Sequence, residues 1–293
     1  MNQNWVDLPA VKIIVKANNI HMAFTRGIKS FIEFSGLFGI IHTYSRKSGW
    51  SVIEMPEIAF IFVEEHNKFI YKNIRNKVFP SGISPVPEEE FRKNLNHYSK
   101  LPLNTPNQRN DIEKRIFRAL EWYYLAFNSI DIPTKIIYLF SALEALLTLK
   151  EDRKKGETLV IRSNLLSARI DNTHTIPENF LWLYEYRSKI VHGSLNFSNY
   201  MLDYNLSFSD KNDIETSIIR ELEFSFIRIF KHYVEFTEQN SLKRLSKLIN
   251  ILEKRDEKFD LLIDWIIKNY KHNLLLEYIK EYFGIDVGNI PNS

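Results

Sequence analysis

The stretch FLWLYEYRSKIVHG, residues 180–193, decides the fold class, because its apolar residues recur with the period of an α-helix. At about 100° per residue, one face carries the spacing of a core stripe, formed by Phe180, Leu183, Tyr184 and Val191. Gly193 suits the left-handed position that commonly follows a helix. We therefore predict a helix that ends at Gly193 and packs on other helices.

The segments on either side of this stretch are also helical in pattern. Asn110 and Asp111 are good N-caps for a helix to residue 128, and Pro133 suits the first turn of a helix to residue 150. Further helices are predicted at 159–170, from Pro177 to 193, at 213–237 and, two or three of them, within 242–283. Five successive helices with short connections predict a bundle.

The first hundred residues have a different pattern. β-branched and aromatic residues predict strands at 11–16 and within 51–66, where Pro56 favours an edge strand or two short strands. The glycine-containing segment 24–41 is compatible with either helix or strand. We divide the chain into a small α+β region at 1–105, a helical bundle at 106–240 and a helical extension at 241–293. The predicted fold class is mainly α.

Composition narrows the class of protein. With 44% hydrophobic and 26% charged residues the chain is globular, and its lack of cysteine excludes disulfides and thiolate zinc sites. A formal charge of +3 is small for a dedicated duplex-DNA binder. The sequence holds no nucleotide-binding or zinc-hydrolase motif, no signal peptide and no apolar stretch long enough for a bilayer. We expect a soluble cytoplasmic protein without membrane contact, metal or cofactor.

Two charged residues occupy positions where the helical pattern predicts apolar ones. Arg187 lies in the core stripe of residues 180–191, and Glu144 lies among the apolar residues of SALEALLTL, 141–149. Buried charges are costly unless they are paired. The two can form a purely structural, bidentate ion pair between helices, or Arg187 can face an anionic ligand such as phosphate while Glu144 orients it from behind. Both interpretations can hold together.

His192 follows Arg187 by five residues, which places it about 140° further around the helix. The two side chains therefore do not share one face within a single subunit. A histidine at the C-terminal end of a helix can simply interact with the helix dipole, or it can transfer protons.

The segment YRSKIVHG, 186–193, resembles the HEPN signature, an arginine followed after four to six residues by a histidine near the end of a helix. The flanking segments FSALEALLTL, 140–149, and LVIRSNLLSARI, 159–170, resemble the two preceding helices of Apea-like HEPN domains, with Arg162 at a matching position. Helix order and spacing agree over about residues 110–240. The central region is therefore similar to an Apea-like HEPN domain.

This resemblance implies a four- to five-helix bundle that forms a homodimer through the motif helices. It implies a metal-independent endoribonuclease of a toxin or phage-defence type, in which the RNA 2′-OH attacks the adjacent phosphate. Arg187 would stabilise the developing charge and His192 would transfer protons, with Glu144 as an orienting residue. Arg162 would contact phosphate or be structural. Ser188 departs from the family, in which Asn, Asp or His often follows the motif arginine.

A dimer could build each site from the arginine of one chain and the histidine of the other. RNA is the expected substrate, and an antitoxin or other defence-system protein the expected partner. The main alternative is a non-catalytic HEPN-like dimer that binds a protein or a nucleotide, with Arg187 as a member of a structural ion pair. A helical adaptor that acts through its C-terminal helices is a further alternative.

Overall fold

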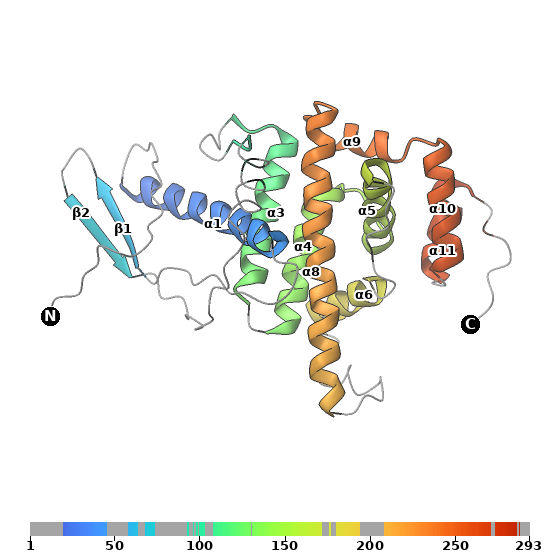
Figure 1. Ribbon diagram of the computed structural model, residues 1–293, viewed down its shortest axis with the longest axis horizontal. Coiled ribbons are helices and arrows are strands. Elements are labelled where there is room, and N and C mark those ends of the chain that lie inside the picture. The colour runs from blue at the N-terminus through green and yellow to red at the C-terminus, as the bar shows by residue number, and fades with distance from the viewer. Residues whose placement is uncertain are drawn as a thin grey trace.

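Helices make up most of the structure, a computed structural model that describes residues 20–45, 58–63, 68–73, 108–129, 131–171, 180–193, 208–270 and 273–285, with residues 93, 96, 98, 100–102, 176 and 287. The predicted mainly α class is confirmed. The helices, shown in Figure 1, are α1 (Ile20–Ser45), α3 (Asp111–Phe127), α4 (Ile132–Leu147), α5 (Lys155–Asp171), α6 (Phe180–Val191), α8 (Phe208–Gln239), α9 (Leu245–Leu252), α10 (Glu257–Asn269) and α11 (Asn273–Phe283).

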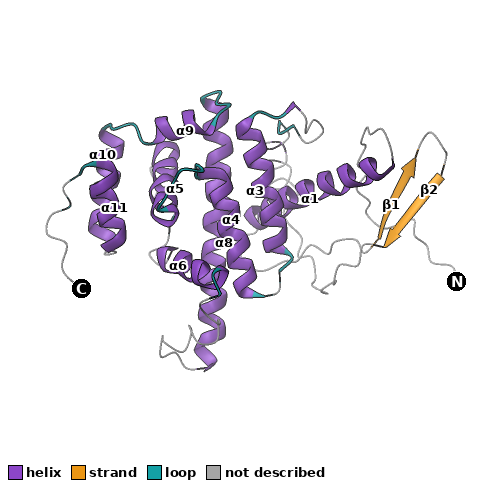
Figure 2. Ribbon diagram, turned by 180° about the vertical axis from the view of Figure 1, so that it is seen from behind, coloured by secondary structure: helices purple, strands orange, loops and turns teal. Residues whose placement is uncertain are grey.

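Two strands form an antiparallel hairpin, β1 (Ile58–Val63) and β2 (Lys68–Asn73), with Ile58 opposite Asn73. β1 lies within the predicted segment 51–66, and Pro56 lies outside the described residues. The hairpin lies at the end of the molecule opposite to α10 and α11, as Figures 1 and 2 both show. The predicted strand at 11–16 lies outside the described residues.

Local capping signals set several of the helix ends. Asn110 forms a capping box with Glu113 at the start of α3, and the Asp131 side chain accepts from the Thr134 N–H at the start of α4. After the C-terminal end of α6, Gly193 adopts a φ of 69°, the left-handed conformation predicted for it. Some predicted boundaries are wrong by a few residues: α4 ends at Leu147, because Thr148 is already extended, α5 begins at Lys155 and α8 begins at Phe208.

The segment that the sequence left open between helix and strand forms α1, which packs on α3. A Cβ at Gly36 would lie 2.3 Å from the Leu120 carbonyl oxygen, so glycine permits a close approach of the two helices. Beside this contact, Arg109 donates to both carboxylate oxygens of Glu33, at 2.7 Å each. Leu37, Ile40 and Ile41 belong to the same buried cluster as the apolar face of α3. The hydrophobic core therefore crosses the predicted boundary near residue 105.

Helix α5 lies deepest in the bundle. Its residues from 158 to 168 are all buried, including Arg162, Ser163, Asn164 and Ser167. It packs against six other helices, α4, α6, α8, α9, α10 and α11. Figure 2 shows the C-terminal helices beside it from behind. Among the helices described, none is both long and apolar enough to cross a membrane.

Candidate functional site

Three polar side chains from two helices meet where α6 packs on α4. Arg187 of α6 donates from Nη2 to Glu144 Oε2 of α4, at 3.4 Å. The Tyr184 hydroxyl, one turn before Arg187 on α6, donates to the other carboxylate oxygen of Glu144, at 2.7 Å. The Arg187 and Glu144 side chains are 19% and 17% exposed. The structure thus pairs the two charges predicted to lie in the core, but through one oxygen of Glu144 and one nitrogen of Arg187 rather than as a bidentate fork.

Tyr184 was predicted as a core residue, and its polar role was not foreseen. Burial, followed by the negative charge of Glu144, raises the pKa of its hydroxyl above the ordinary value. The hydroxyl therefore keeps its proton and acts as the donor to Glu144. The sequence feature that could have revealed this role is the spacing of Tyr184 and Arg187, because residues i and i+3 share a helix face.

Arg187 makes fewer hydrogen bonds than Arg109 and Arg162, two arginines that also form ion pairs. Arg109 uses both terminal nitrogens on Glu33 and its Nε on the Pro102 carbonyl, while Arg162 contacts two carboxylates and a carbonyl. The Nε of Arg187 is buried, yet no described residue accepts a hydrogen bond from it. A buried donor without an acceptor costs about 1–3 kcal/mol. The guanidinium of Arg187 therefore has donor capacity left over.

His192 lies at the solvent-exposed end of α6. Its backbone N–H donates to the Ser188 carbonyl at 3.0 Å, which closes the last turn of the helix. Ser188 itself is half-buried. Val191 was predicted to lie in the core stripe and is instead 52% exposed, a correction that follows from the helix end, where the neighbouring helices no longer cover it. Among the predicted site residues, the structure brings Glu144 and Arg187 together and leaves His192 at the surface.

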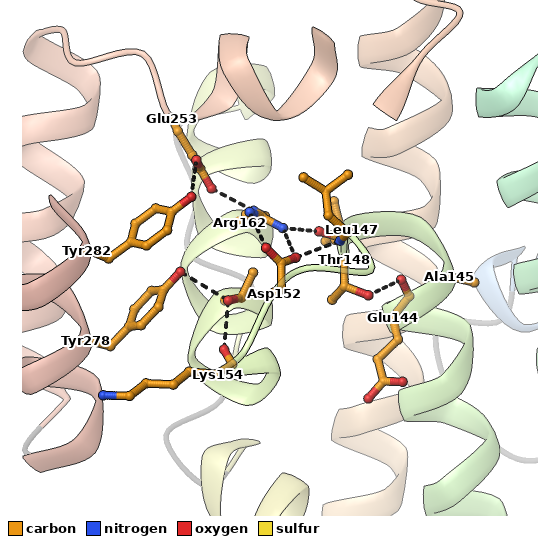
Figure 3. A network of polar contacts seen from close by, with 12 residues as sticks. Glu144, Ala145, Leu147, Thr148, Asp152, Lys154, Arg162, Glu253, Tyr278 and Tyr282 are labelled. Carbon is orange, nitrogen blue, oxygen red and sulfur yellow. Dashed lines mark hydrogen bonds and ion pairs between the residues drawn. The ribbon is translucent and has the colours of Figure 1, made fainter. Parts of the chain in front are cut away.

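Arg162 is a structural residue, one of the two roles considered for it. Its side chain is 1% exposed and is held by Asp152, by Glu253 Oε1 at 2.7 Å from Nε, and by the Leu147 carbonyl at 2.9 Å from Nη1, as Figure 3 shows. Burial alone would lower the pKa of the guanidinium, but hydrogen bonds and attraction from both carboxylates outweigh it and raise the pKa. Each guanidinium nitrogen of Arg162 donates a hydrogen bond within the protein, so none is left to bind a phosphate.

The partners of Arg162 were not found from the sequence. Asp152 lies in the charged loop 150–155, which looks like an ordinary exposed connection. Glu253 follows α9, 91 residues after Arg162. In the part of the chain that the structure describes, no group of three or more histidine and acidic side chains could hold a metal ion.

Comparison of the chain with protein-family models, with curated proteins and with solved structures finds no match.

Proposed function

We propose that this protein is a metal-independent endoribonuclease of the HEPN type, in which Arg187 binds the scissile phosphate and His192 transfers protons. The observation that carries the proposal is the unsatisfied guanidinium of Arg187. The two buried arginines of the described residues, Arg109 and Arg162, each engage all three guanidinium nitrogens in hydrogen bonds. Arg187, which is half-buried, instead has one hydrogen bond among the described residues, to Glu144, and its Nε has no acceptor there.

The chemistry of the two residues suits this reaction. A guanidinium matches the oxygens of a phosphodiester in shape and charge, and it stabilises the extra negative charge of a phosphorane. An imidazole can take the proton of the attacking 2′-OH or protonate the leaving 5′-oxygen. The products are a 2′,3′-cyclic phosphate and a free 5′-hydroxyl, so the atoms balance without a metal or water in the first step.

The placement of His192 makes a dimer part of the proposal. Arg187 points toward α4 while His192 lies at the exposed end of α6, about 140° away around the helix. A two-fold axis near the end of α6 would bring the histidine of one chain to the arginine of the other. The exposed Val191, beside His192, supplies apolar surface for such a contact. A toxin or phage-defence role, with an antitoxin or other defence-system partner, rests on the family resemblance alone.

The test is cleavage of a single-stranded RNA by the full chain in excess EDTA, beside a DNA of the same sequence. We expect the RNA to be cut and the DNA to stay intact, because DNA lacks the 2′-OH. His192→Ala should lower the rate by about a hundredfold or more while its thermal unfolding stays that of the wild type. Arg118→Ala, which removes an exposed arginine on α3, is the matched control and should leave the rate unchanged.

Three outcomes would contradict the proposal: cutting that needs a divalent metal, cutting of DNA at the same rate, or full activity in His192→Ala. The Glu144–Arg187 ion pair favours a second candidate, a HEPN-like binding module in which Arg187 stabilises the packing of α6 on α4. That candidate predicts no cleavage by the wild type and unfolding at a lower temperature in Arg187→Ala.

A further inference from the structure

Tyr184 has a fixed place between three helices. Its ring meets Phe140 of α4 edge to face, with centroids 5.2 Å apart at 86°. On another side it lies against Gly156, at the start of α5, where an added Cβ would come within 2.6 Å of the ring atom Cδ1. With α4 and α5 both against the ring, the hydroxyl has little freedom to leave Glu144.

The carboxylate of Glu144 accepts hydrogen bonds from two donors, Tyr184 and Arg187, one at each oxygen. Oε1 accepts from Tyr184 at 2.7 Å, and Oε2 accepts from Arg187 at the longer distance of 3.4 Å. A guanidinium and a carboxylate frequently form two short parallel bonds. The Arg109–Glu33 pair of this chain does so, at 2.7 Å for each bond.

We infer that Tyr184 is a positioning residue that keeps Arg187 available to an RNA phosphate by occupying one oxygen of Glu144. This inference rests on the proposed role of Arg187 as a phosphate ligand. Without the hydroxyl, Glu144 Oε1 loses its donor in a site where the side chain is only 17% exposed. The carboxylate is then stabilised by turning both oxygens to Arg187. The resulting bidentate ion pair competes with the phosphate for the guanidinium.

The experiment measures binding of a short fluorescein-labelled RNA whose 2′-hydroxyls are methylated, so that the 2′-oxygens cannot attack and the protein cannot cut it. Tyr184→Phe should bind this RNA roughly tenfold more weakly than the wild type, the ratio expected for losing one charge-assisted hydrogen bond to competition. Tyr278→Phe is the matched control, because it removes another buried hydroxyl, bonded to Thr158 at 3.1 Å, away from α6. It should keep the wild-type affinity.

A second change separates positioning from simple support of the fold. In the double variant E144Q/Y184F residue 144 has no carboxylate charge, so Arg187 cannot form a bidentate ion pair with it. RNA affinity should return to within about threefold of the wild type. A tyrosine needed only for packing would leave the double variant as weak as Tyr184→Phe, or weaker, and that result would overturn the inference.

The remaining outcomes also decide between the two proposals. Equal RNA affinity in Tyr184→Phe and the wild type, or no RNA binding by the wild type, overturns the role of Tyr184. Cleavage of unmodified RNA in EDTA is measured separately on the same proteins. The expected binding pattern without any cleavage would support Tyr184 and reject the nuclease. Cleavage with unchanged binding in Tyr184→Phe would keep the nuclease and reject the role of Tyr184.

Discussion

Arg162 of α5 donates from Nε to Glu253 Oε1, at 2.7 Å, and so joins the bundle to the connection between α9 and α10. The same guanidinium donates to Asp152 and to the Leu147 carbonyl at the end of α4. One buried side chain thus ties together the helix that carries Glu144, the α4–α5 loop and the C-terminal helices (Figure 3).

Arg162→Met should therefore destabilise the protein strongly. It leaves two carboxylates, on Asp152 and Glu253, whose side chains are 7% and 15% exposed and which lose their counter-charge. We expect a loss of about 3–5 kcal/mol in the free energy of unfolding, measured by urea denaturation. The control is Arg255→Met, at an arginine that is 63% exposed in its pair with Asp260 and should cost less than about 1 kcal/mol. Equal effects of the two substitutions would show that the buried network contributes no more to the free energy of unfolding than an exposed ion pair does.

Two glycines of α1 should respond in opposite directions to alanine. Gly36→Ala places a methyl group 2.3 Å from the Leu120 carbonyl oxygen, so α1 must move off α3, at a cost of about 1–3 kcal/mol. Gly27→Ala meets nothing within 4 Å and should stabilise the helix by about 0.5–1 kcal/mol. Urea denaturation of both variants checks the pair. Stabilisation by Gly36→Ala would mean that α1 is not packed on α3 in this way.

His232 should make stability depend on pH. It is buried on α8, with Nδ1 at 3.1 Å from the Ser167 hydroxyl and Nε2 at 3.3 Å from Asp171. Burial lowers its pKa from the ordinary 6.5, and Arg228 and Lys231 lower it further, although Asp171 and Glu235 act in the opposite sense. Between pH 6.5 and the lower pKa of the folded state, the unfolded chain therefore binds a proton that the folded chain does not, so stability falls as the pH falls through this range.

His232→Gln tests this pH dependence, because glutamine keeps hydrogen-bonding groups but cannot be protonated. The unfolding temperature of the wild type should drop more steeply than that of His232→Gln as the pH is lowered from 7 through 6.5 toward 5. Parallel curves for the two proteins would assign the pH dependence to other groups.

Mixing two inactive variants should restore activity if the proposed site is shared between chains. A dimer of His192→Ala with Arg187→Ala has one site with both residues intact and one with neither. Random exchange of subunits at equal concentrations should recover roughly a quarter of the wild-type cleavage rate. A mixture that stays inactive, although subunits exchange, would place arginine and histidine in the same chain or exclude the nuclease.

Local signals in the sequence determined much of the helical fold. The capping residue Asn110, Pro133 in a first turn and the terminal Gly193 act within a few residues, so the starts of α3 and α4 and the end of α6 could be predicted closely. The period of apolar residues also placed Glu144 and Arg187 on apolar helix faces, and the structure shows the two side chains half-buried and in contact. Segment 24–41 lacked such signals, and two of its glycines, Gly36 and Gly39, serve the close approach of α1 to α3.

The sequence by itself thus determined the helices after residue 110, several of their ends and the two charges on apolar helix faces, because each depends on interactions within a few turns. Only the tertiary structure decided that Tyr184 shares Glu144 with Arg187, that Glu253 reaches Arg162 across 91 residues, and that Val191 is exposed. These depend on which helices become neighbours and where each stops covering the next. That outcome is set by the packing of the whole core, which no local pattern encodes.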